Sequence, residues 1–154
     1  MIKGNKGEWS ELYVLLRLLA YGKIYAADDQ VKKIKNVYFP ILKIIREEVK
    51  GKRLEYRIGK NEDVEIYSND IKIKSISKER LKKEADYLYN EIVNMKSRSF
   101  EIEQTEKFAN EIECYRLSAP STDKTDIKIQ IHDIHTGFEP VCGFSIKSEL
   151  GSAP

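Results

Sequence analysis

The residues best suited to chemistry lie near the C-terminal end of the chain, in two segments that alternate apolar and polar side chains. In the first segment isoleucines occupy positions 127, 129 and 131, which leaves Asp126 on the polar side. In the second, apolar residues occupy positions 142, 144 and 146, which leaves Ser145 and Lys147 on the polar side. A carboxylate, a hydroxyl and an ammonium group on one face can together hold a divalent cation and activate water for hydrolysis.

The stretch between these two segments predicts a turn. Residues 135–140 contain Gly137 and Pro140, so the two segments are expected to form an antiparallel hairpin. If both apolar rows pack on the same side of this hairpin, Asp126 comes close to Ser145 and Lys147. An amphipathic hairpin with a solvated outer face is the alternative explanation of the same alternation.

Three runs of the chain resemble the HpaII family of type II restriction endonucleases. They are GNKGEWSELY at residues 4–13, GKIYAAD at residues 22–28 and GFSIKSELG at residues 143–151. The resemblance implies an α+β fold with a PD-(D/E)XK restriction-endonuclease-like core, in which helices flank a mixed sheet. It also implies that Mg²⁺ is the cofactor and that double-stranded DNA is cut at CCGG.

Within this resemblance Asp126 corresponds to the first metal-binding aspartate of the PD-(D/E)XK pattern, and Lys147 corresponds to its lysine. The pattern has an acid two residues before the lysine, where this chain has Ser145. A hydroxyl is a weaker, uncharged ligand for a hard cation that prefers carboxylate oxygen. We therefore expect a carboxylate from another part of the chain to complete the metal site.

Glu11 is the first candidate for this second carboxylate. It lies on the edge of a predicted helical stripe formed by Leu12, Leu15, Leu16 and Leu19, so it is expected to face the sheet. Its alternative role is that of a favourable negative charge near the N-terminus of a helix. Glu149 and Glu8 are the other candidates.

The elements that must position these residues can be read along the chain. We predict a helix over about 7–21 that ends at Gly22, a long helix over 78 to about 96 that is capped by Ser77, and another helix over 103–115. Strands are predicted at 37–45, 54–58, 64–67 and 71–76. The expected organisation is one domain, with a core helix at 1–22, a β-rich insertion at 23–76, helices at 77–116 and the catalytic hairpin at 117–154.

Two basic stretches are candidates for contacts with DNA. Residues 43–60 contain seven basic and three acidic side chains, and residues 71–83 contain six basic side chains and one acidic side chain, although the formal net charge of the chain is only +2. Basic side chains give salt-dependent affinity for phosphates; a solvated face is the alternative. The candidate DNA-binding residues are Lys43, Arg46, Lys52, Arg53, Arg57, Lys72 and Lys74.

The remaining expectations concern location and partners. The chain lacks an apolar run of the roughly 18 residues that a membrane span needs and lacks the apolar core of a signal peptide, so a cytoplasmic protein without a membrane partner is expected. The two cysteines have no metal-ligand spacing and are expected to be thiols. Cutting both DNA strands calls for a homodimer or for sequential nicking.

The chain ends shortly after the lysine motif, whereas the resembled family continues. We therefore expect an N-terminal portion of a longer nuclease, which by itself binds DNA weakly and cleaves it poorly or not at all. Two other functions fit the sequence: a non-catalytic DNA-binding module with a decayed metal site, and an interaction domain without a nucleic-acid partner. Of these three functions, only that of a nuclease requires Asp126, Lys147 and a divalent cation.

Overall fold

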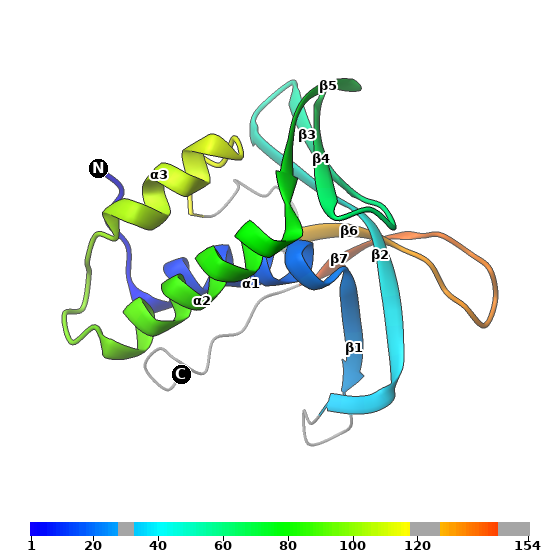
Figure 1. Cartoon of the computed structure of the whole chain (residues 1–154), viewed down its shortest axis with the longest axis horizontal. Coiled ribbons are helices and arrows are strands. Elements are labelled where there is room, and N and C mark those ends of the chain that lie inside the picture. Colours follow the sequence, from blue (N-terminus) through cyan, green and yellow to red (C-terminus); the bar gives the residue numbers. More distant parts are fainter. Residues whose placement is uncertain (28–32, 118–126, 145–154) are drawn as a thin grey trace.

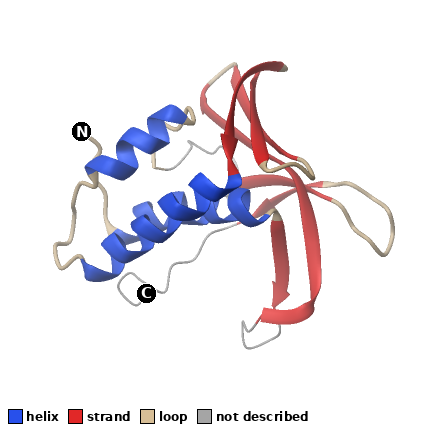
Figure 2. Cartoon of the chain, viewed as in Figure 1, coloured by secondary structure: helices blue, strands red, loops and turns tan. Residues whose placement is uncertain are grey.

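A helical layer and an antiparallel sheet make up the fold (Figures 1 and 2). The computed structural model describes residues 1–27, 33–117 and 127–144. Over these residues the elements follow in the order α1 (Lys6–Tyr21), β1 (Lys23–Ala27), β2 (Lys33–Val49), β3 (Lys52–Ile58), β4 (Asp63–Ser68), β5 (Ile71–Ser77), α2 (Lys78–Asn94), α3 (Glu103–Glu111), β6 (Ile127–Ile131) and β7 (Val141–Phe144). The described part of the chain is therefore α+β, as predicted.

Helix α1 begins and ends where the sequence predicts. The Asn5 side chain accepts a hydrogen bond from the backbone N–H of Glu8 (2.8 Å), and the Glu8 carboxylate accepts one from the N–H of Asn5 (3.2 Å). This reciprocal capping box satisfies two donors at the start of the helix. Gly22 ends the helix in the left-handed conformation, with φ at 67°. The predicted stripe is buried and consists of Leu12, Leu15, Leu16 and Leu19.

The sheet is built around the long strand β2. The strand order is β5-β4-β3-β2-β6-β7, and β1 pairs with the N-terminal part of β2. Strand β2 passes through Pro40, which lacks a backbone donor, at the point where the pairing with β1 ends and the pairing with β6 begins. All described strand pairs are antiparallel, so the expected mixed sheet was wrong for this part of the chain.

One face of the sheet carries a continuous buried row. The pairing places Ile129 of β6 opposite Ile44 of β2, Ile44 opposite Tyr56 of β3, and Tyr56 opposite Ile66 of β4. All four side chains have no exposed surface. The predicted β-rich segment and the C-terminal hairpin thus contribute to the same sheet and the same core.

Helices α2 and α3 lie between β5 and β6 in the chain. The Ser77 hydroxyl accepts a hydrogen bond from the N–H of Arg80 (3.1 Å) and caps α2, as predicted. Helix α3 ends at Glu111 and not at Tyr115, because the chain turns into the left-handed region at Glu113 (φ 68°). This turn brings Cys114 into the core. None of the helices in the described ranges is long and apolar enough to cross a membrane.

Candidate functional site

The predicted hairpin is present as strands β6 and β7. Ile127 lies opposite Phe144, and Ile129 lies opposite Cys142. Side chains directly opposite each other share one face of a sheet, so the two apolar rows pack on the same side, as expected. The same register puts Lys128 opposite Gly143 on the other face, and Lys128 is exposed.

The residues at the centre of the predicted metal site lie outside the described residues. This applies to Asp126, Ser145 and Lys147, and also to the alternative ligand Glu149. Their convergence on the polar face of the hairpin therefore stays a prediction. Among the residues that the structure describes, no group of three or more His, Cys, Asp or Glu side chains could hold a metal ion.

The two other candidate carboxylates, Glu8 and Glu11, both lie on α1. Glu8 is exposed and is held in the capping box with Asn5, which gives it a structural role. Glu11 is half-buried beside Leu12 and Leu15 of the buried stripe. Its position on the edge of the stripe is the one predicted, whereas its role as a second metal ligand stays a prediction.

The loop between β6 and β7 is organised by its own hydrogen bonds. His132 Nδ1 lies 3.0 Å from Glu139 Oε2, and the Asp133 carboxylate accepts a hydrogen bond from the N–H of His135 (2.9 Å). This backbone hydrogen bond lowers the pKa of Asp133 below its ordinary value. His135 is a turn residue, as predicted, and both acids are engaged in shaping the loop.

Three of the predicted DNA-binding cations converge on one carboxylate on the face of the sheet opposite the core. Glu55 Oε2 lies 3.2 Å from Lys43 Nζ and 3.0 Å from Arg53 Nε, and Glu55 Oε1 lies 2.9 Å from Arg57 Nη2. Glu55 is only 3% exposed, whereas the three cationic side chains reach solvent. This Glu55 cluster therefore holds three cations around one buried anion, and Arg57 Nη2 also lies 3.5 Å from the exposed carboxylate of Asp70. The cluster keeps an excess of positive charge at its outer surface.

The charge state of Glu55 follows from its surroundings. Burial raises the pKa of Glu55, while the hydrogen bonds from Arg57, Lys43 and Arg53 lower it, and the net result is a pKa below the ordinary value. The carboxylate is therefore ionised at neutral pH. It fixes the positions of the three cations.

Arg46 differs from the other predicted cations because it is buried on the core side of β2. Its Nε donates to Glu48 Oε2 (2.8 Å), and its Nη2 donates to the carbonyl of Arg116 (2.6 Å). Glu48 in turn accepts from the N–H of Tyr115 (3.0 Å). This network ties the segment after α3 to the sheet, so Arg46 presents no charge to a ligand.

The last three predicted cations pair with carboxylates at the surface. Lys72 Nζ lies 2.7 Å from Glu65 Oε2, whereas Lys74 and Lys52 lie 3.1 Å and 4.0 Å from the carboxylate of Glu113. All three lysines are partly exposed. Lys52 and Lys74 thus share the carboxylate of Glu113, whereas Lys72 has a separate partner, and all three extend the charged surface.

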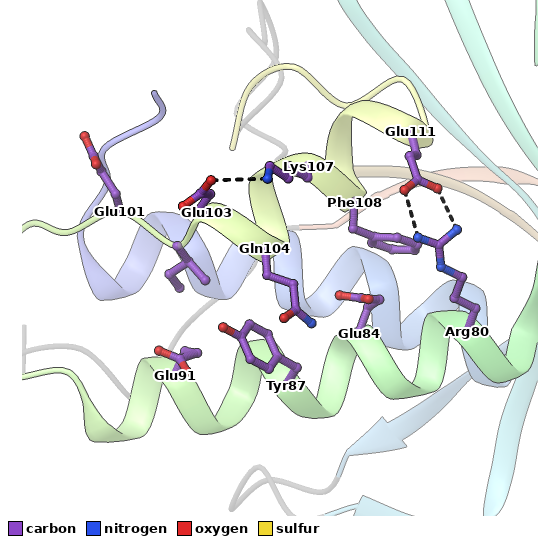
Figure 3. A pocket seen from close by; sticks show the side chains of 11 residues that line it. Arg80, Glu84, Tyr87, Glu91, Glu101, Glu103, Gln104, Lys107, Phe108 and Glu111 are labelled. Carbon is purple, nitrogen blue, oxygen red and sulfur yellow. Dashed lines mark hydrogen bonds and ion pairs between the residues drawn. The ribbon is translucent and has the colours of Figure 1, made fainter.

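A groove between α2 and α3 has a volume of about 670 Å³, and its lining includes five glutamates and two basic residues (Figure 3). Arg80 pairs with Glu111 (2.6 Å), and Lys107 pairs with Glu103 (3.2 Å). The remaining acidic residues that line it are Glu84, Glu91 and Glu101. This negative surface disfavours phosphates, so it is not a place for DNA.

The sequence analysis considered the basic residues only as a stretch of positive charge. It did not identify Glu55 as the carboxylate with which three of them pair. The pattern was available, because Glu55 and Arg57 alternate within the predicted strand 54–58 and Arg53 precedes it with the same spacing, so the three share a face if the strand begins one residue earlier. Lys43 could be added only with the pairing of β2 and β3, which places it opposite Arg57.

Comparison with known proteins gives two matches. The family model described as HpaII restriction endonuclease matches residues 5–154. The type II restriction enzyme HpaII of Haemophilus parainfluenzae is 40% identical over 152 residues, which cover 97% of this chain and 41% of that relative. The chain thus spans less than half the length of this relative. No solved structure matches the chain.

Proposed function

Because this chain belongs to the HpaII restriction endonuclease family, we propose that it carries the catalytic residues of a type II restriction endonuclease. The reaction is the Mg²⁺-dependent hydrolysis of duplex DNA phosphodiesters at CCGG, in the cytoplasm. The observation that carries this proposal is the match to the family model, which covers residues 5–154 and so includes Asp126 and Lys147. The proposed core is of the PD-(D/E)XK type.

In this proposal Asp126 and Glu11 hold the cation through carboxylate oxygens. When bound, Mg²⁺ supplies positive charge that polarises a phosphate oxygen and makes water a better nucleophile. Lys147 orients the attacking water and offsets the negative charge that develops on the phosphate. Ser145 contributes a hydroxyl at the position where the family pattern has an acid.

The Glu55 cluster supports a role in binding the DNA backbone. Lys43, Arg53 and Arg57 are partly exposed and held in place by one buried anion, so their donors are positioned before a phosphate arrives. We retain Lys52, Lys72 and Lys74 as flanking contacts. Arg46 is left out of the proposed surface because it is buried.

The catalytic proposal can be tested in a chimera in which this chain replaces the matching part of the Haemophilus relative. With Mg²⁺, the chimera is expected to cut a duplex that contains CCGG and to spare one that contains GGCC. Asp126→Ala and Lys147→Ala should each lower the cleavage rate by at least about 100-fold, the scale of losing one charge-stabilising catalytic group. Single-turnover cleavage measures the loss.

The two glutamates of α1 provide a matched comparison in the same chimera. Glu11→Gln should abolish Mg²⁺-dependent cleavage but leave duplex binding in EDTA intact, whereas Glu8→Gln should cut nearly as well as the parent. Cleavage that persists in Asp126→Ala would refute the catalytic assignment. Duplex binding without cleavage in the parent would instead favour the non-catalytic DNA-binding module. Sedimentation of the chimera on a duplex tests the proposed homodimer.

A further inference from the structure

A second basic site lies where the C-terminus of α1, the N-terminus of α2 and the β3–β4 turn meet. This cavity has a volume of about 440 Å³, and its lining includes Tyr21 of α1, Lys60 and Glu62 of the turn, and Lys78 and Lys82 of α2. The lysines come from two separate elements that the fold brings together. We name this site the Tyr21 pocket.

The lysines of the Tyr21 pocket differ in their partners from the cations of the Glu55 cluster. No carboxylate of the described ranges forms an ion pair with Lys60, Lys78 or Lys82. Lys78 Nζ donates to the carbonyl oxygen of Gly59 (2.9 Å), which fixes its position without cancelling its charge. Positive charge at this site is therefore available to a ligand.

The aromatic ring of Tyr21 contacts Lys82 of the pocket and one further cation, Arg17. The guanidinium of Arg17 lies 4.8 Å from the ring centroid, and Lys82 Nζ lies 5.0 Å from it. The ring is 47% exposed, so it holds both cations at the surface and does not bury them. This arrangement keeps them close together without an anion.

The geometry of α2 separates this site from the acidic groove. Residues two apart on a helix point in nearly opposite directions, about 200° apart, so Lys78 and Lys82 face away from Arg80 and Glu84 of the groove. The pocket also lies at the N-terminal end of a 17-residue helix, whose dipole adds to the positive potential. Glu79, which also lines the pocket, is paired with Lys83 (3.6 Å).

We propose that the Tyr21 pocket binds a phosphodiester of the DNA backbone through Lys60, Lys78 and Lys82. The inference rests on the proposed function, because a free phosphate or nucleotide has the same chemistry. The position of the pocket at the end of α1 favours DNA over a free phosphate or nucleotide. Tyr21 is ten residues from the proposed metal ligand Glu11, about 15 Å along the helix axis. A duplex that reaches Glu11 would extend over this distance and present further phosphates.

The test measures binding of a 20-base-pair CCGG duplex by this chain without divalent metal, by fluorescence anisotropy over a range of salt concentrations. Losing one phosphate contact should lower the slope of log K against log salt by about 0.9, which is about eightfold in affinity at 0.1 M salt. We expect this loss for Lys82→Gln. Lys107→Gln, an equally charged change at an exposed helical lysine in the acidic groove, should leave affinity and slope nearly unchanged.

A third variant guards against effects of misfolding. Glu62→Gln removes a negative charge from the pocket lining and should increase duplex affinity about threefold, the size of a screened repulsion at about 6 Å. A damaged protein would not gain affinity. If Lys82→Gln bound DNA with the same affinity as Lys107→Gln, while the parent bound measurably at low salt, the pocket assignment would be overturned and the proposed function would stand.

A titration with inorganic phosphate distinguishes a site for the DNA backbone from a site for a free anion. The titration should shift the NMR signals of the Tyr21 ring in the parent chain, and DNA should compete with the phosphate. A parent chain that binds no duplex even at low salt would contradict the proposed function itself. Phosphate-induced shifts at Tyr21 in that case would overturn the assignment to DNA and identify a free-anion site.

Discussion

At the scale of the residue, the carboxylate of Glu55 forms more ion pairs than any other charged group in the described part of the chain. A buried carboxylate is costly unless it is paired, and here three cations contribute to the pairing. Those cations reach solvent, so the same contacts that stabilise the sheet also preorganise a positive surface. The structural role of Glu55 and the DNA-binding role that we propose for its cluster therefore depend on the same contacts.

We predict that Glu55→Gln lowers the free energy of unfolding at pH 7 by about 1–3 kcal/mol, because charged hydrogen bonds are lost from a buried position. Since the pKa of Glu55 is lowered in the folded state, its contribution is present above the unfolded pKa and is lost as the pH falls through the folded pKa. The difference between parent and variant should therefore shrink in acid.

Urea unfolding at pH 7 and near pH 3 measures this difference. Glu65→Gln is the matched control, because the Lys72–Glu65 pair lies on the same sheet but is exposed on both sides, and exposed pairs contribute about 0–1 kcal/mol. An equal loss in both variants, or a Glu55→Gln loss that persists in acid, would contradict the assigned role of Glu55.

At the scale of the element, the joint between α1 and the sheet depends on Gly22. Its φ of 67° is left-handed, a Cβ at this position would meet Ile58 Cγ2 at 3.3 Å, and its carbonyl accepts from the N–H of Ile41 in β2 (2.9 Å). Gly22→Ala should therefore lower the free energy of unfolding by about 1–2 kcal/mol, the cost of a left-handed Cβ. Gly59→Ala, where φ is not positive and the nearest atom is 3.9 Å away, should cost nothing in the same urea titration.

The elements that could be predicted from the sequence are those set by local chemistry. The capping residues Ser77 and Gly22, the leucine stripe of α1 and the alternation in β6 and β7 each identify an element without tertiary information. The end of α3 could not be predicted, because a helical pattern continues to Tyr115 while the turn at Glu113 is fixed by burial of Cys114 against Tyr56.

Strand pairing limits the prediction of the site in the same way. The alternation in β2 does not say that Arg46 points into the core, and it does not identify β6 as the neighbour of β2. Lys60 and Lys82 are 22 residues apart in the chain, so only the packing of α2 beside the β3–β4 turn brings them into one pocket. The hairpin itself was predicted because its strands are adjacent in sequence.

At the scale of the whole molecule, β2 connects the N-terminal helix to the C-terminal hairpin. The N–H of Ile41 in β2 donates to the carbonyl of Gly22 at the end of α1, and the next residues of β2 pair with β6. The C-terminal hairpin pairs with a strand about 85 residues earlier, and Ile129 completes the buried row of the sheet. The hairpin is therefore part of the single core and not an appended unit. A substitution that destabilises the hairpin should therefore also lower the free energy of unfolding measured at α1.

The single tryptophan of the chain makes this expectation measurable. Trp9 is fully buried in α1, and its ring stacks on Phe100 with centroids 6.4 Å apart, so its fluorescence reports on the helical layer. Ile129→Ala, in β6, should lower the free energy of unfolding seen by Trp9 by about 2–5 kcal/mol, because a fully buried side chain leaves a cavity. Val141→Ala, at a 52% exposed position in β7, should change it by less than about 0.5 kcal/mol. If Ile129→Ala instead lost β-sheet circular dichroism at low urea while the Trp9 transition stayed in place, the hairpin would unfold independently of the helices and the single core would be refuted.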